Sequence, residues 1–159
     1  IMSSDWSSDV CSSDLDVQAL ARVDVQLATD SLLPLEQVAV GGRYSVRGYR
    51  ENQLVRDNGL TASLETRIPI VRNALFADSL FLAPFIDYGR GWNQDRPTPN
   101  IKDLYSVGIG LIWTWTPLPS RPEFETYGEI YWGLPLKDVD NPDDDLQDDG
   151  LHFMLTVNY

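Results

Sequence analysis

Apolar and polar residues alternate along most of the chain with a period of two. In a β-strand successive side chains point to opposite faces, whereas a helix would scatter the two sets around its axis. A further segment, 80–88, is apolar on both faces except at Asp87. The pattern predicts an all-β fold of about six strands, each about 9–12 residues long. The alternating segments are 17–27, 60–68, 105–115, 124–134 and 151–159.

The connections between these segments alternate in length. Those after the second and fourth strands are short, at 71–79 and 116–122. Those after the first, third and fifth strands are longer and polar, at 29–59, 90–103 and 135–150. Short and long connections in turn are typical of an antiparallel up-and-down meander whose long loops all lie on one side.

The outward face of these strands has the character of a lipid-facing wall. Ten residues tilted by about 40° span roughly 25 Å, the height of an outer-membrane apolar band. The opposite face carries small residues and charges such as Glu65, Arg67 and Glu129, which suit a water-filled lumen. A soluble β-sandwich also alternates and stays an alternative. The apolar face ends in aromatic side chains, as interfacial girdles do: Tyr105, Trp113, Trp115, Phe124, Trp132 and Tyr159.

Six membrane strands do not close a barrel. The smallest outer-membrane barrels have about eight strands. An open sheet would leave unpaired backbone groups in lipid. We therefore expect this chain to be part of a larger barrel.

The charge of the chain is concentrated in one segment. The 159 residues hold 12 Lys and Arg against 24 Asp and Glu, a net charge of −12, which disfavours a nucleic-acid partner. Seven aspartates and one lysine between 137 and 149 contribute half of it. Clustered oxygens suit Ca²⁺, but the spacing lacks the EF-hand order, so we interpret this stretch as a solvated loop without a metal. The longest apolar run, 80–86, is far too short for a transmembrane helix.

The first 15 residues differ from the rest. Residues 3–14 repeat Ser-Ser-Asp three times, with no hydrophobic period. The stretch resembles translated sequencing-adapter sequence, so we expect residues 1–15 to be non-native or disordered and the native start to be missing. Cys11 is the only cysteine, which leaves residues 16–159 without a disulfide, a thiol nucleophile or a cysteine zinc site. We expect no cofactor.

Two motifs stand out. The first connection contains GGRYSVRGYREN over residues 41–52 and Asp-Asn-Gly at 57–59, with glycines typical of a shaped loop. The other motif, Phe85-Ile86-Asp87-Tyr88-Gly89, places Asp87 on the inward face together with Phe85. An inward carboxylate near an arginine-rich loop requires a partner.

These motifs resemble those of TpsB transporters of two-partner secretion, the haemolysin secretion/activation proteins of the outer-membrane β-barrel translocase superfamily. Val46, Arg47, Gly48 and Tyr49 match the sixth-loop signature of that family. Phe85, Asp87 and Gly89 match its F-x-D-x-G strand motif. The resemblance covers about residues 16–159. Barrel-assembly proteins carry a close variant of the loop motif, but the Arg-Glu-Asn and Asp-Asn-Gly extensions favour the secretion branch.

The resemblance implies a 16-stranded barrel in the outer membrane of a Gram-negative bacterium, with residues 16–159 as its C-terminal part. The sixth loop would fold into the lumen, and Arg47 would pair with Asp87. The partners implied are outer-membrane lipid, a large β-helical exoprotein of the TpsA type exported unfolded without ATP, and the barrel-assembly machinery, which reads a last strand ending in an aromatic residue, here Tyr159. The plug helix and the POTRA domains lie outside this chain.

Three alternatives stay open. The first is a barrel-assembly insertase of the same superfamily, and the second is a soluble β-sandwich binding module. The third is a transporter in which Arg47 and Asp87 are only a structural staple. Catalysis has no support, because G-x-S-x-G, H-E-x-x-H and phosphate-cradling loops are absent from the sequence. The single histidine, His152, lies on the polar face of the last strand and is expected to line the lumen.

Overall fold

The computed structural model describes residues 2–11, as backbone only, and residues 17–75, 77–95, 97–99, 101–117, 124–139 and 149–158. Within these ranges the chain forms strands and connections and no helix. No helix of the described part is therefore long and apolar enough to cross a membrane.

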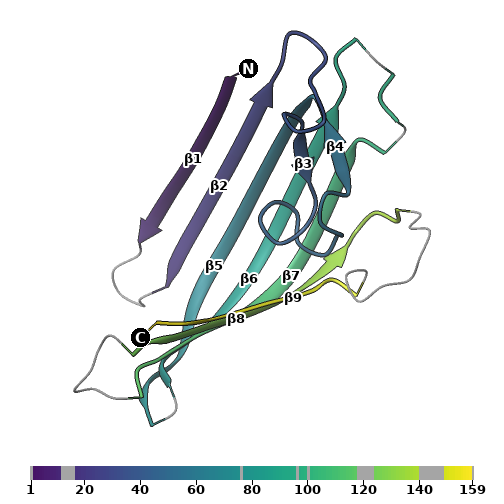
Figure 1. Cartoon of the computed structure of the whole chain (residues 1–159). Helices are drawn as coiled ribbons and strands as arrows, with labels where there is room; N and C mark the ends of the chain where they lie inside the picture. Colours follow the sequence, from purple (N-terminus) through teal and green to yellow (C-terminus); the bar gives the residue numbers. More distant parts are fainter. Residues whose placement is uncertain are drawn as a thin grey trace.

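Seven strands form one antiparallel sheet. Its order is β1-β2-β5-β6-β7-β8-β9, so strands next to each other in the sheet follow one another along the chain except where the hairpin β3–β4 intervenes. Figure 1 shows a twisted sheet in which β8 and β9 cross the direction of β1 and β2 at a steep angle. The expected all-β antiparallel meander is confirmed. Its strands are β1 (Met2–Cys11), β2 (Gln18–Leu27), β5 (Asn58–Ala74), β6 (Ala77–Trp92), β7 (Asp103–Trp115), β8 (Thr126–Pro135) and β9 (Leu151–Val157).

The sheet has one strand more than the hydrophobic pattern predicts. Strand β1 lies in the segment for which we expected no regular structure, and it pairs with β2 from Met2 opposite Leu27 to Cys11 opposite Gln18. A β-ladder is made by backbone groups, so a strand can add to an existing edge without an apolar face of its own. That residues 1–15 are foreign to the natural protein stays a prediction.

Strands β5 and β6 are longer than expected. The connection is short, as expected, but its predicted bounds of 71–79 are wrong, because β5 continues to Ala74 and β6 begins at Ala77. Their pairing shifts register between Pro69 and Val71. Proline has no N–H to donate to a ladder and is tolerated at such irregularities. This bulge and the polar residues after it interrupt the apolar period without ending the strand.

The two faces of the sheet differ as the alternation predicts. Glu65, Asp87, Ser106 and Glu129 are buried on the inner face. Large apolar side chains of β5 to β9 are exposed on the outer face, including Leu64, Ile86, Ile109, Leu111, Ile130, Trp132 and Phe153. Since these outer side chains are largely exposed while the buried side chains face inward, the core of the described chain lies on the inner face, under the first long connection.

That connection carries a two-stranded hairpin, β3 (Val38–Val40) and β4 (Leu54–Arg56), which lies in front of the inner face in Figure 1. Val40, Val46, Tyr49, Leu54 and Leu104 form a buried apolar cluster beneath it. Four of these five residues come from the hairpin and its loop. Folding this connection over the sheet therefore supplies most of one hydrophobic core.

Candidate functional site

The loop between β3 and β4 has a defined shape. Gly41, Gly42 and Gly48 adopt positive φ angles of 115°, 94° and 95°, a region that side chains with a Cβ rarely enter. The Gly42 N–H donates to Val46 O over 3.1 Å, and the Ser45 N–H donates to Gly42 O over 3.2 Å. These internal bonds fold residues 41–49 into a compact turn that presents Arg47 to the sheet.

Arg47 is held side-on by Asp87 of β6. Arg47 Nε lies 2.8 Å from Asp87 Oδ2, and Arg47 Nη2 lies 2.9 Å from Asp87 Oδ1. The backbone N–H of Arg47 also donates to Asp87 Oδ2 over 3.0 Å. Only 1% of the Asp87 surface and 7% of the Arg47 surface are exposed. The structure thus brings the loop motif and the strand motif together in a buried bidentate ion pair.

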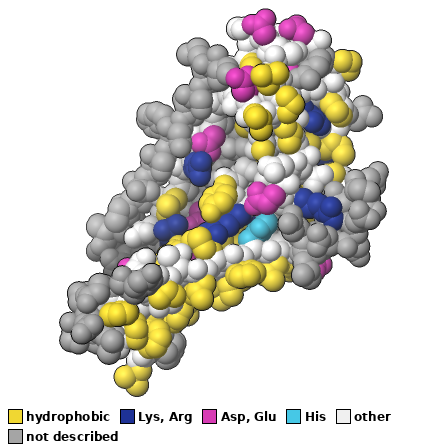
Figure 2. All heavy atoms as spheres, in the orientation of Figure 1, with side chains coloured by type: hydrophobic (Ala, Val, Ile, Leu, Met, Phe, Trp, Pro, Cys, Tyr) yellow, Lys and Arg dark blue, Asp and Glu magenta, His cyan; other side chains and the backbone are white. Residues whose placement is uncertain are grey.

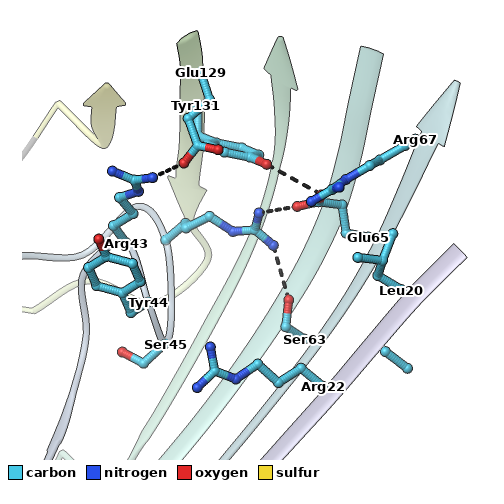
Figure 3. Close-up of a pocket in the computed structure, with 12 residues that line it drawn as sticks. Leu20, Arg22, Arg43, Tyr44, Ser45, Ser63, Glu65, Arg67, Glu129 and Tyr131 are labelled. Carbon is cyan, nitrogen blue, oxygen red and sulfur yellow. Dashed lines mark hydrogen bonds and ion pairs between the residues drawn. The ribbon is translucent and has the colours of Figure 1, made fainter. Parts of the chain in front are cut away.

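Strand β5 supplies two further partners that the sequence did not reveal. Arg47 Nη1 donates to Glu65 Oε2 over 2.5 Å, and Arg47 Nη2 donates to Ser63 Oγ over 3.0 Å. Ser63 donates in turn to Asp87 Oδ1 over 2.6 Å. Arg67 Nε binds the other oxygen of Glu65 over 2.9 Å. Figure 3 shows the β5 part of this network, with Ser63, Glu65 and Arg67. The charges of Arg47 and Arg67 balance those of Asp87 and Glu65.

Two aromatic rings complete the pocket for the guanidinium. Arg47 Cζ lies 3.6 Å from the ring centre of Phe85 and 4.8 Å from that of Tyr131. A cation over an aromatic face gains electrostatic attraction without needing water. Burial alone would lower the pKa of Arg47, but its bonds to Asp87 and Glu65 outweigh burial, so the pKa is raised. Arg47 therefore stays charged, and the phenylalanine of the strand motif acts as a stacking partner.

The other motif residues contact different strands. Val46 is fully buried and lies against Gly89 of β6, where a Cβ would stand 2.6 Å from Val46 Cγ2. The Tyr49 hydroxyl donates to Tyr105 O of β7 over 2.9 Å and accepts the Lys137 N–H after β8 over 3.2 Å. The Gly48 N–H donates to His152 Nε2 of β9 over 3.2 Å. Together with Arg47, these residues fasten the loop to β5, β6, β7 and β9.

The Asp-Asn-Gly sequence at the start of β5 binds other connections. Asp57 is fully buried, and its carboxylate accepts the Leu32 N–H over 3.1 Å, Gln37 Nε2 over 2.8 Å and the Gln94 N–H over 2.9 Å. Asn58 Oδ1 accepts the Ala28 N–H over 2.7 Å. This motif therefore joins the connections after β2 and β6 at one end of the sheet.

A polar hollow of about 270 Å³ lies beside the loop. Arg43 from the loop forms an ion pair with Glu129 of β8 at its border, and Tyr127 donates to the same carboxylate over 2.6 Å. Figure 2 shows the charged side chains gathered in the middle of this face, next to the single histidine. The hollow is lined from β2 by Leu20, Ala21 and Arg22, from the loop by Arg43, Tyr44, Ser45 and Arg47, and from β5 and β8 by Ser63, Glu65, Arg67, Glu129 and Tyr131.

Some sequence predictions fall elsewhere. Residues 140–148 of the aspartate-rich segment and Tyr159 lie outside the described residues. Within the part of the chain that the structure covers, no group of three or more His, Cys, Asp or Glu side chains is arranged to hold a metal ion. His152 is half-buried on the inner face.

Comparison with known families places this geometry in context. The profile of haemolysin secretion/activation protein ShlB/FhaC/HecB matches residues 2–112, a range that includes both motifs and the ion pair between them. The chain belongs to this family. ShlB/FhaC/HecB proteins are outer-membrane transporters with a secretion/activation role. No curated protein matches the chain.

Proposed function

We propose that residues 16–159 form the C-terminal part of a 16-stranded barrel in the outer membrane of a Gram-negative bacterium. In this proposal the barrel exports a large β-helical exoprotein as an unfolded chain, and the loop at 41–53 lies in the lumen. Lipid covers the outer face, and the last strand is the segment that the barrel-assembly machinery reads. Membership of the ShlB/FhaC/HecB family supports this function.

The observation that carries the proposal is the buried bond between Arg47 and Asp87. It holds a long connection against the face that would line the lumen, where the connection occupies the space above β5, β6 and β7. The hollow next to Arg43 and Arg22 leaves room along β2. In this proposal the loop closes the channel while its ion pairs with the sheet, above all that of Arg47 with Asp87, are formed.

The test is secretion by the full-length transporter with Arg47→Ala. We expect a strong loss of the exoprotein from the medium at normal levels of assembled barrel. Arg90→Ala is the matched control, because Arg90 is half exposed and lies 3.7 Å from its partner Asp103. Normal secretion with normal barrel levels would show that Arg47 and Asp87 are a structural staple only.

The membrane location has its own test. We expect residues 16–159 produced without detergent to aggregate, because their outer face exposes many large apolar side chains. A soluble monomer that melts cooperatively would instead support the β-sandwich alternative and remove the membrane proposal.

A further inference from the structure

The side of the loop opposite the arginine network rests on glycines. Gly48 of the loop, Gly133 of β8 and Gly150, just before β9, meet at one point. A Cβ on Gly133 would stand 2.7 Å from Gly48 N and 2.8 Å from Arg47 C. A Cβ on Gly150 would meet the carbonyl oxygen of Gly133 and lie 3.2 Å from Gly48 Cα. The backbones of three segments therefore touch directly, at a distance that only glycine permits.

Hydrogen bonds hold the three segments at this contact. The Gly133 N–H donates to Gly150 O over 2.9 Å, which joins β8 to the start of β9. The Gly48 N–H donates to His152 Nε2, so the histidine ring accepts from the loop and needs an unprotonated Nε2 there. His152 is opposite Tyr131 in the β8–β9 pairing, and Tyr131 lies against the Arg47 guanidinium.

The loop is thus held from two sides by different chemistry. Its Arg47 side chain binds β5 and β6 through charge, and its Gly48 backbone binds β8 and β9 through close packing and one hydrogen bond. The network around Arg47 reaches β8 only through ring contacts and the Tyr131 hydroxyl, which donates to Glu65 over 3.3 Å, and Arg43 of the same loop forms its own ion pair with Glu129 of β8. The glycine contact is therefore a separate connection to the last two strands.

We propose that Gly133, Gly150 and His152 are positioning residues that seat the loop on β8 and β9. They form an uncharged attachment, which must be released together with the ion pairs of Arg47 and Arg43 before the loop leaves the inner face. The importance of this seat for export rests on the proposed function. The contact of the loop with β8 and β9 does not rest on that function, because it follows from the position of the loop in the structure.

The experiment measures release of the loop directly. A reporter cysteine replaces the buried Val46 in the full-length transporter from which other cysteines, including Cys11, have been removed. The rate at which a maleimide labels this cysteine reports how often the loop opens, because a fully buried thiol reacts only when it is uncovered. Export is recorded separately, so failure of labelling and failure of export are distinguishable.

Gly133→Ala is expected to raise the labelling rate by about tenfold or more, because the new methyl group meets loop backbone that has no side chain to rotate away. Gly128→Ala on the same strand is the control, because a Cβ there would point to the outer face, 3.2 Å from Trp113 Cε3. Equal labelling rates in the two variants would overturn the proposal.

His152 gives an independent test if the Gly133 variant does not assemble. His152→Phe removes the acceptor and is expected to raise the labelling rate. His152→Gln keeps an acceptor oxygen and is expected to label close to the rate of the parent. A purely space-filling role for His152 predicts no difference between Phe and Gln, and that result would also overturn the proposal.

Discussion

Val46 Cγ2 stands where Gly89 lacks a side chain, 2.6 Å from the position a Cβ would take. The same relationship repeats beside it, because a Cβ on Gly59 would meet Val38 Cγ1 at 2.5 Å and a Cβ on Gly91 would meet Arg56 Cγ at 2.8 Å. The glycine of the strand motif therefore serves the loop motif. It makes room for the apolar side of the hairpin on the inner face of the sheet.

Gly89→Ala is expected to weaken the hold on the loop. The added methyl group meets two buried valines that pack in the core cluster, so overpacking should lower the free energy of unfolding by about 1–3 kcal/mol. Urea unfolding of the assembled barrel measures this. Gly91→Ala is the control and should cost less, because the side chain of Arg56 can move aside. Equal losses would argue against the valine contact as the cause.

Asp87→Asn is expected to destabilise the barrel more than Glu65→Gln. Asp87 accepts three bonds from Arg47 and one from Ser63, whereas without the Glu65 charge Arg47 keeps all of its bonds to Asp87. Breaking a buried ion pair costs about 3–5 kcal/mol when the remaining charge stays buried. Urea unfolding of the single variants and of Arg47→Ala with Asp87→Asn gives the coupling between the two residues. Additive effects would show that they do not act as a pair.

Tyr49→Phe is expected to cost about 1–3 kcal/mol, because the loss of the hydroxyl leaves backbone groups of Tyr105 and Lys137 without this partner. The ring and its packing stay. Tyr44→Phe is the control, since 70% of Tyr44 is exposed. The free energies of unfolding of the two variants are compared to test this. If Tyr49→Phe is as stable as Tyr44→Phe, the hydroxyl of Tyr49 does not have the stabilising role assigned to it.

Asp57→Ala is expected to loosen the connections after β2 and β6 while the arginine network stays intact. Three donors lose their acceptor together, and buried donors without a partner are costly. Limited proteolysis should then cut within 28–37 faster than in the parent protein. Asp30→Ala, at an exposed residue of the same connection, should leave the cleavage rate unchanged. Unchanged cleavage in both variants would show that Asp57 does not secure this segment.

Ile109→Arg tests the outer face. Ile109 lies near the middle of β7 with its side chain exposed on the apolar side. An arginine at the bilayer midplane of a barrel costs about 2–4 kcal/mol, and near the interface much less. We therefore expect less assembled barrel with Ile109→Arg than with Tyr105→Arg, close to the end of the same strand. Equal assembly would mean that lipid does not cover this face.

The period of two was sufficient to predict the sheet and its two faces. It failed at β1, where backbone pairing alone makes the strand, and at the ends of β5 and β6, where Pro69 and the polar residues after it hide the continuation. Strand ends depend on which neighbour offers a ladder partner, and one segment read alone does not contain that information.

The site was partly visible in the sequence. The pairing of Arg47 with Asp87 was expected from the resemblance, and the structure contains it. The inward direction of Ser63 and Glu65 follows from alternation, but their approach to Arg47 depends on the register that sets Ser63 opposite Asp87. The contact of Gly48 with Gly133 and Gly150 joins residues that lie 85 and 102 positions away along the chain, and it follows from the path of the folded chain.

The glycines under the hairpin determine which surface is exposed when the loop leaves the inner face. Gly59, Gly89 and Gly91 lie on adjacent strands and share the inner face. Once the valines and the arginine stem are lifted away, they expose bare peptide backbone instead of a row of side chains. A polypeptide passing along this wall would meet few projecting side chains and would bind it weakly. The passage would be widest where the loop had been.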